Sequence, residues 1–244
     1  MDLFLSFLYF LIGVIPCILW LIFYLRQDVH PESNKKVIEI FLWGVVIVVP
    51  VVVVEKFLEI FFPTENILFQ NLPLLFLYYI VGVGFVEEFS KYFIVRSRVI
   101  NSSEFDEPID AMLYLIIAGL GFATVENIIV IFNVGTLEGL KGAAIVSLIR
   151  PFTAIFIHTL AAGITGYFLA LSLHQKPKKR GIFVLSGLLL SSTFHGIYDA
   201  FMLQLEESSS LFSLLLPFAI IVLVGVLVYI FFVKVKKMPR TCRI

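Results

Sequence analysis

Charge is what this sequence has least of. Asp, Glu, Lys and Arg together make up 15% of its 244 residues, against roughly 25% in soluble domains. The formal net charge is zero, so no basic excess indicates a nucleic-acid partner. The two cysteines, Cys17 and Cys242, provide neither a disulfide framework nor a cysteine metal site. Because 60% of the residues are apolar, we expect one integral membrane domain over residues 1–244 and no sizeable soluble domain.

Apolar runs are long enough to cross a bilayer seven times. A helix needs roughly 20 residues to span a hydrocarbon core about 30 Å thick, and it satisfies its backbone hydrogen bonds internally. The predicted spans are Leu3–Leu25, Val37–Phe62, Leu72–Val95, Ile109–Phe132, Phe152–Leu173, Ile182–Leu203 and Leu211–Val233. The sequence therefore predicts an all-α, polytopic helical membrane protein with about seven transmembrane helices, surrounded by lipid.

Lysine and arginine lie in alternate connections between these spans. The first, third and fifth connections and the C-terminal tail contain several of them. The second connection, with Glu65, and the sixth, with Glu206 and Glu207, contain no Lys or Arg, and the fourth contains only Lys141. Cytoplasmic loops carry an excess of Lys and Arg. We therefore expect an integral protein of the cell membrane, with its N-terminus outside and its C-terminus in the cytoplasm.

The fourth connection is unusual in being partly apolar. Gly135–Arg150 is too short and too interrupted to span the bilayer twice, yet Ala143–Ile149 is apolar. We predict a re-entrant or interfacial helix near 142–150. Arg150 at its end would either cap the outer entrance of a cavity or reach toward lipid headgroups.

Six ionisable residues lie within the predicted spans or at their edges. Inserting a charged side chain at the bilayer centre costs about 3 kcal/mol, so such groups usually face a protein-lined cavity and serve a function. They come from four different spans, which indicates that they converge on one site. They are Glu87, Glu88, Glu126, His158, His195 and Asp199.

Glu87 and Glu88 are adjacent and precede Lys91. The i,i+4 spacing of Glu87 and Lys91 favours an ion pair on one helix face. A residue one step further points about 100° away, so we expect Glu88 to be left unpaired. Two buried neighbouring carboxylates repel each other, which favours a functional role for the pair.

The other members of the set each have a structural alternative. Glu126, next to Asn127, follows small residues that permit close helix packing, and it could simply hydrogen-bond between helices. A lone His158 could be a core histidine with satisfied hydrogen bonds. His195 and Asp199 share one helix face, so they could form a proton relay, a pair of metal ligands, or an imidazole oriented by a carboxylate.

At these residues the sequence resembles the PrsW family of intramembrane proteases. The matching blocks are Glu87-Glu88-Phe-Ser-Lys91, Pro108-Ile-Asp110 through Gly119-Leu-Gly-Phe-Ala-Thr-Val-Glu126-Asn127, Arg150, His158 through Gly166-Tyr167, and Phe194-His195-Gly-Ile-Tyr-Asp199. They cover a protease-like core of about residues 72–203. Their order implies catalytic roles for the six ionisable residues, supported by Lys91, Asn127 and Arg150.

A more distant similarity is to CAAX-type prenyl endopeptidases. In that family a Glu and a His activate water, and a second His with an Asn one turn later is thought to hold the oxyanion. Here Asp199 stands where that Asn would be, which argues against a pure donor role for it. The PrsW resemblance implies a membrane-anchored protein substrate, such as an anti-sigma factor.

Two forms of hydrolytic chemistry fit these residues. The sequence contains neither a Gly-x-Ser-x-Gly elbow nor a His-Glu-x-x-His helix. In one scheme Glu87 or Glu88 activates water together with His158. In the other, which we favour slightly, a Zn²⁺ ion is held by His158, His195 and a carboxylate of Glu87, Glu126 or Asp199. The alternative function is a proton-coupled transporter or channel that uses the same set as a relay.

The depths of the six residues do not agree with one another. Counted from the predicted outer ends, the four other than the Glu87–Glu88 pair lie about 6–12 Å below the surface. Glu87, counted from Leu72, would lie about 22 Å deep, unless its helix begins deeper or Gly82 and Gly84 allow a kink. The depth of these four residues predicts a cavity in the outer half of the membrane. Such a cavity suits cleavage of an extracytoplasmic or juxtamembrane segment of a substrate.

Overall fold

A computed structural model describes residues 2–28, 30–61, 71–207 and 211–239, and this part of the chain contains helices but no strands. The elements are α1 (Leu3–Leu25), α2 (Asn34–Phe61), α3 (Leu72–Leu77), the π-helix η2 (Tyr78–Gly84), α4 (Phe85–Arg98), α5 (Pro108–Ile149), the 3₁₀ turn η3 (Arg150–Phe152), α6 (Ala154–Leu173), α7 (Pro177–Glu207) and α8 (Leu211–Val235). The all-α prediction is confirmed.

Six stretches of the described chain are long and apolar enough to cross a membrane. One of them, Pro108–Leu173, is 66 residues long and contains both α5 and α6, which were predicted as separate spans. The first span, Leu3–Leu25, has the predicted bounds. Phe62, the predicted end of the second span, and Glu65 lie outside the described residues.

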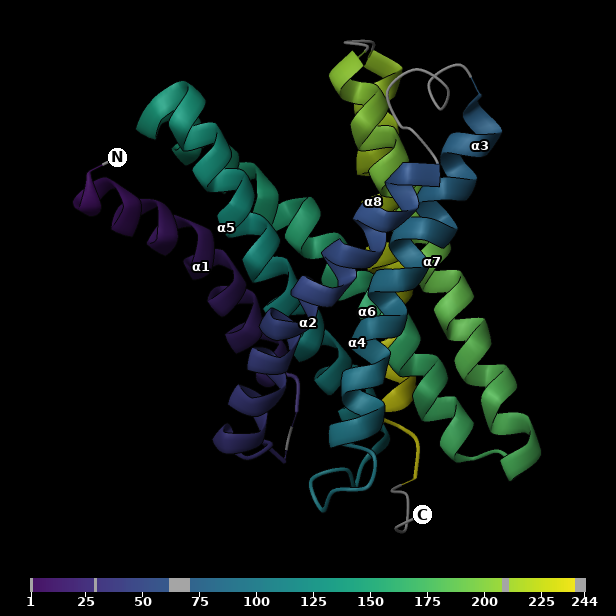
Figure 1. Cartoon of the computed structure of the whole chain (residues 1–244). Coiled ribbons are helices and arrows are strands. Elements are labelled where there is room, and N and C mark those ends of the chain that lie inside the picture. Colours follow the sequence, from purple (N-terminus) through teal and green to yellow (C-terminus); the bar gives the residue numbers. More distant parts are fainter. Residues whose placement is uncertain (1, 29, 62–70, 208–210, 240–244) are drawn as a thin grey trace.

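The long helices form two groups that diverge toward one end of the molecule (Figure 1). α1 and α5 lean to one side, α3, α7 and α8 lie on the other, and α2 passes in front. The first half of α5 is the centre of the core, since its residues from Pro108 to Thr124 are almost all buried. α5 packs on α1, α2 and α6, and α6 packs in turn on α7. Four helices thus carry polar residues into the space between the two groups.

Small residues let α2 approach α5 at backbone distance. A Cβ atom built on Gly44 of α2 would lie 3.1 Å from Cα of Gly121 on α5. A larger side chain at either position would therefore force the two helices apart. The expectation that Gly119 and Gly121 permit close helix packing is confirmed, because the nearest atoms to Gly119 belong to Ala162 and His158 of α6. His158 is thereby held close to the helix that carries Glu126.

A reversal at Gly139 divides α5 into two arms, 108–138 and 140–149. Gly139 has φ 71° and ψ −169°, a left-handed conformation that glycine adopts readily. Ala143 of the second arm packs against Ile131 of the first and against Tyr9 of α1. The extra helix predicted near 142–150 is therefore present. The predicted end of the fourth span at Phe132 is too early, because no helix-breaking residue precedes Gly139.

The π-helix η2 lies directly before the Glu87–Glu88 pair. Its last hydrogen bond joins the amide of Phe85 to the carbonyl of Ile80, five residues back. π-Helical turns often mark functional sites. Gly84 contacts α7 here, since a Cβ on it would lie 2.7 Å from the carbonyl oxygen of Ser192. Gly196 of α7 fits equally tightly, with Cα of Ile80 only 2.5 Å from its would-be Cβ.

The start of α5 is capped as expected for an acidic residue at a helix N-terminus. The Asp110 carboxylate accepts hydrogen bonds from the amides of Asp106, at 2.9 Å, and Glu107, at 2.7 Å. One turn later the Tyr114 hydroxyl donates to the Glu32 carboxylate at 2.5 Å. Burial raises the pKa of Glu32 to about 7. These contacts fix the end of the core remote from the ionisable set.

The close fit between η2 and α7 predicts the effect of enlarging Gly196. Gly196→Ala would force Cβ into the backbone of Ile80, and overpacking of this kind costs about 1–3 kcal/mol. Thermal unfolding in detergent should show a clear loss of stability. Gly181→Ala, also on α7, is the matched control because no atom lies within 4 Å of its would-be Cβ. Equal melting temperatures for both variants would contradict the tight packing.

Candidate active site

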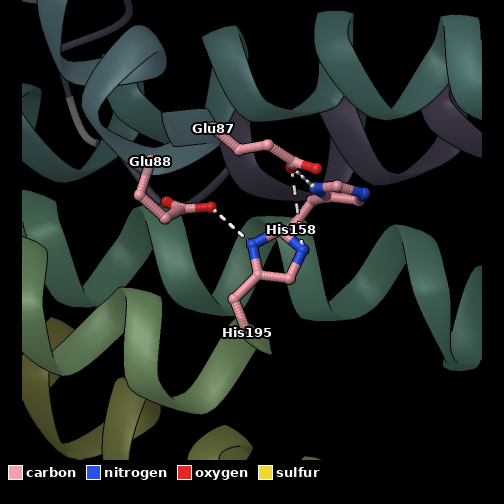
Figure 2. Close-up of side chains that lie close together, drawn as sticks. All are labelled: Glu87, Glu88, His158 and His195. Atoms are coloured by element: carbon pink, nitrogen blue, oxygen red, sulfur yellow. Dashed lines mark hydrogen bonds and ion pairs between the residues drawn. The ribbon is translucent and has the colours of Figure 1, made fainter. Parts of the chain in front are cut away.

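Four buried side chains from three helices converge in the core (Figure 2). Glu87 and Glu88 come from α4, His158 from α6 and His195 from α7. Oε2 of Glu87 lies 3.6 Å from Nδ1 of His158 and 3.7 Å from Nε2 of His195. Glu88 approaches His195 from the other side, with Oε1 2.9 Å from Nδ1. We call these four residues the inner set.

Lys91 lies within the inner set and neutralises part of its charge. Its Nζ donates to Oε1 of Glu88 at 2.6 Å and to Oε2 of Glu87 at 3.3 Å. It also lies 3.0 Å from Nδ1 of His158, and the ring of Phe122 is 4.7 Å away. The lysine is completely buried, so these contacts replace its whole hydration shell.

This arrangement corrects one expectation from the sequence. Glu88 was expected to point away from Lys91 and remain unpaired, yet its contact with the ammonium is shorter than that of Glu87. The i,i+3 spacing also brings side chains together on a helix, and the long lysine side chain reaches both carboxylates. One oxygen of Glu88, Oε2, is nevertheless buried without a hydrogen-bond partner in the described part of the chain.

Two further carboxylates border the inner set and are more accessible. The Glu126 side chain is 32% exposed and its Oε2 lies 2.5 Å from Nε2 of His158. The Asp199 side chain is 25% exposed and its Oδ2 lies 3.5 Å from Nε2 of His195. All six residues predicted from the sequence are therefore brought together, and neither histidine is the isolated core residue of the structural alternative.

The contacts of the two imidazoles determine which ring nitrogen carries the proton. Lys91 can only donate, so Nδ1 of His158 accepts and its Nε2 donates to Glu126. Nδ1 of His195 faces Glu88 at hydrogen-bond distance, which leaves Nε2 without a proton in the neutral ring. Each histidine thus donates outward to a carboxylate and turns a lone pair toward Glu87.

A cavity of about 670 Å³ opens onto this site. Glu87, Glu126, His158, His195 and Asp199 all line it, whereas Glu88 does not. The walls come from α2, η2, α5, α6 and α7. Despite the different depths counted from the sequence, Glu87 lines the same cavity as the histidines, and a π-helix lies between Leu72 and Glu87.

Sequence reasoning missed two carboxylates of this cavity, Glu55 and Glu59 of α2. Glu55 of α2 lines it, and Oε1 of Glu55 is buried without a hydrogen-bond partner among the described residues. Glu55 lies inside a predicted span, so the rule that selected the other six would have found it. Its neighbours Lys56 and Glu59 form an exposed pair at 2.8 Å, which made this part of α2 resemble an ordinary polar helix end.

Asn127 and Arg150 connect the site to its surroundings. Nε of Arg150 donates to Oδ1 of Asn127 at 2.7 Å, and Nδ2 of Asn127 donates to the carbonyl of Gly13 at 2.6 Å. Arg150 also lines the cavity. Arg150 is thus held on the cavity wall by Asn127 of the first arm of α5.

The inner set has the donors that a zinc ion requires. Zinc binds imidazole nitrogen and carboxylate oxygen at about 2.0–2.2 Å, mostly with tetrahedral geometry, which places ligand atoms about 3.4 Å apart. The 3.6 and 3.7 Å separations of Glu87 from the two imidazoles are close to this spacing. One atom from each of the four residues lies within 4.8 Å of the others. Glu126 and Asp199 are not part of that group.

The carboxylate partners of the two histidines and the charge balance of the site also agree with a zinc ion at the inner set. Metal-binding histidines usually donate their other ring N–H to a carboxylate, as His158 does to Glu126 and His195 to Glu88. Four carboxylates lie within 4 Å of the imidazoles, against the two cationic side chains Lys91 and Arg150, so full ionisation leaves two negative charges uncompensated before Glu55 is counted. A divalent cation would balance them, and it would take over the contact that Lys91 makes with His158.

Buried Glu and His residues beside a cavity, on membrane-length helices, are the groups that an intramembrane hydrolase would need. The chain is matched over residues 32–233 by the family described as PrsW family intramembrane metalloprotease. It belongs to that family and is an integral membrane protease.

Several curated relatives named Protease PrsW support this assignment. The chain is 30% identical over 196 residues to those of Geobacillus kaustophilus and Bacillus subtilis, covering 80% of this chain and 80% and 83% of theirs. The relative from Clostridioides difficile is 28% identical over 199 residues, covering 81% of this chain and 79% of its own. No solved structure matches.

The contacts of Lys91 predict a large loss of stability in Lys91→Met. The substitution keeps an apolar side chain but leaves Glu87 and Glu88 buried without a cation, and breaking a buried pair costs about 3–5 kcal/mol. This loss of stability should appear as a lower melting temperature. The measurement needs a chelator, since a bound metal ion would itself neutralise the two carboxylates. Lys56→Met is the control, because its exposed pair with Glu59 is worth about 1 kcal/mol or less. A normal melting temperature for Lys91→Met would show that the lysine does not hold the site.

Proposed function

We propose that this protein hydrolyses a peptide bond of a membrane-anchored protein, using a water molecule activated at the inner end of the cavity. The observation that carries the proposal is the approach of Oε2 of Glu87 to one ring nitrogen of His158 and one of His195, at 3.6 and 3.7 Å, on the cavity wall. Peptide hydrolysis needs a base for water, stabilisation of the oxyanion and an acid for the leaving amine.

Each residue of the site has a distinct part in this proposal. Glu126 and Glu88 orient the rings of His158 and His195 through their outer nitrogens, and Lys91 holds Glu88 in place. Asp199 faces the cavity, and the one contact that we find for it, 3.5 Å to His195, is looser than that of Glu126. Asp199 is therefore the carboxylate that takes the proton from the attacking water and passes it to the leaving amine.

Glu87, His158 and His195 would hold a Zn²⁺ ion through Oε2, Nδ1 and Nε2, the two-histidine, one-carboxylate set that zinc hydrolases use. When bound, zinc lowers the pKa of water and polarises a carbonyl oxygen. The spacing of the three donors, the carboxylate partners of both histidines and the two uncompensated negative charges support this assignment.

The substrate class follows from the surroundings of the cavity. A cavity between membrane-length helices accepts a segment of another membrane protein, and the family resemblance favours a single-pass substrate such as an anti-sigma factor. The alternating Lys and Arg residues support an N-terminus outside the cell membrane and a cytoplasmic C-terminus. In this orientation the cavity opens in the outer half, near the extracytoplasmic part of a substrate.

Substitutions in the site should abolish hydrolysis of a membrane-tethered peptide by the purified protein in detergent. Glu87→Gln, His158→Ala, His195→Ala and Asp199→Asn should each lower kcat by orders of magnitude, and a double variant should be hardly slower than either single one, because residues acting as a unit are non-additive. Glu39→Gln is the control, since Glu39 pairs with Lys36 at 3.1 Å outside the cavity. Full activity in His158→Ala or His195→Ala would remove that histidine from the mechanism.

Metal content provides a separate prediction. The purified protein should contain about one equivalent of zinc, which His158→Ala and His195→Ala should lose, because each removes one of three protein ligands. Asp199→Asn should keep the zinc while losing activity, which separates the proton acceptor from the ligands. Chelation should abolish activity and added zinc restore it. Activity that survives exhaustive chelation in metal-free protein would instead assign Glu87 as the base of a metal-free hydrolase.

A further inference from the structure

Tyr198 is a buried tyrosine of the cavity wall to which neither the sequence pattern nor the proposed mechanism assigns a role. It is only 2% exposed, and it lines the cavity together with His195 and Asp199. Its hydroxyl has no hydrogen-bond partner among the described residues. A buried hydroxyl without a partner costs free energy, so its retention at this position calls for an explanation.

The nearest polar neighbour does not supply the missing partner. Thr153 approaches the Tyr198 hydroxyl, but its own hydroxyl donates to the carbonyl of Ile149 at 3.2 Å. The contact between the two hydroxyls does not have hydrogen-bond geometry. The phenol O–H of Tyr198 is therefore left without an acceptor in the described chain, on a residue that lines the cavity.

Helix geometry places this donor beside the reacting groups. His195, Tyr198 and Asp199 lie at positions i, i+3 and i+4 of α7, and residues at this spacing share one helix face. Arg150 lines the same cavity, with its guanidinium fixed by Asn127 at 2.7 Å. A neutral O–H donor and a fixed positive charge thus accompany the proton-accepting carboxylate.

We propose that the Tyr198 hydroxyl stabilises the oxyanion of the tetrahedral intermediate, next to the positive charge of Arg150. The inference rests on the proposed peptide hydrolysis. Water oxygen bonds to the scissile carbonyl carbon, the C=O π electrons move to the carbonyl oxygen, and the water proton goes to Asp199. Tyr198 donates a hydrogen bond to that oxygen and keeps its proton. When the π bond re-forms, the C–N bond breaks and the amine leaves with the proton from Asp199.

This role explains why the donor is a phenol on α7. Asp199, the next residue on α7, accepts rather than donates a hydrogen bond when it is ionised. The adjacent Tyr198 supplies the donor that the carboxylate cannot. Its hydroxyl is neutral and fixed by a buried ring, so little reorganisation is needed when negative charge develops.

The decisive variant is Tyr198→Phe, which removes the hydroxyl and keeps the buried ring. Loss of one oxyanion donor lowers kcat by about 10²–10³-fold, so we expect this decrease on the membrane-tethered peptide, with KM, zinc content and melting temperature unchanged. Binding of a phosphinate peptide that mimics the tetrahedral intermediate should weaken by a similar factor. Binding of an uncleavable substrate-like peptide should stay the same. A merely structural hydroxyl would not produce this difference.

Tyr9→Phe is the matched control. Tyr9 is also fully buried, but its hydroxyl donates to the carbonyl of Gly135 at 2.9 Å, away from the cavity. This variant should lose some thermal stability and keep its kcat. Wild-type rates and phosphinate binding in Tyr198→Phe would overturn the inference and leave the proposed function intact. A wild-type protein that cleaves no membrane-tethered peptide would overturn the proposed function itself, together with this inference.

Discussion

The buried ammonium group of Lys91 is the interaction on which the rest of the site depends. Two adjacent carboxylates in the core of a membrane protein would repel each other and lose their hydration. Nζ of Lys91 donates to Glu88 at 2.6 Å and to Glu87 at 3.3 Å, which compensates both negative charges, and it also contacts His158. With Glu88 fixed in this way, His195 is held through its Nδ1 and presents Nε2 to the cavity. The position of one lysine thus determines the orientation of a histidine 104 residues further along the chain.

Close backbone packing makes this convergence of helices possible. Glycine pairs bring α2 against α5 at Gly44 and Gly121, and η2 against α7 at Gly84 and Gly196. Without a hydrophobic driving force between helices in lipid, association depends on such van der Waals contact and on interhelical hydrogen bonds. The cavity lies beside these contacts, lined by residues of α2, η2, α5, α6 and α7.

The sequence predicted the helices and the six ionisable residues because membrane length and buried charge leave strong local patterns. Their pairing could not be predicted, since Glu88 meets Lys91 and His195 only through side-chain reach and the packing of α4 on α7. The end of α5 was missed because polar residues after Phe132, such as Asn133 and Glu138, interrupt the apolar pattern while the backbone stays helical. Glu55 was overlooked because the neighbouring Lys56 and Glu59 made its surroundings look like a solvated helix end.

The π-helix before Glu87 has a consequence for how this chain can vary. A π-helical turn holds an extra residue compared with an α-helix, and each residue of an α-helix turns the chain by about 100°. Deleting one residue within Tyr78–Gly84 would restore a regular helix and swing Gly84 away from α7, or else rotate Glu87 out of the cavity and Glu88 away from His195. Single-residue gaps in this stretch should therefore be far rarer among functional relatives than changes of side chain.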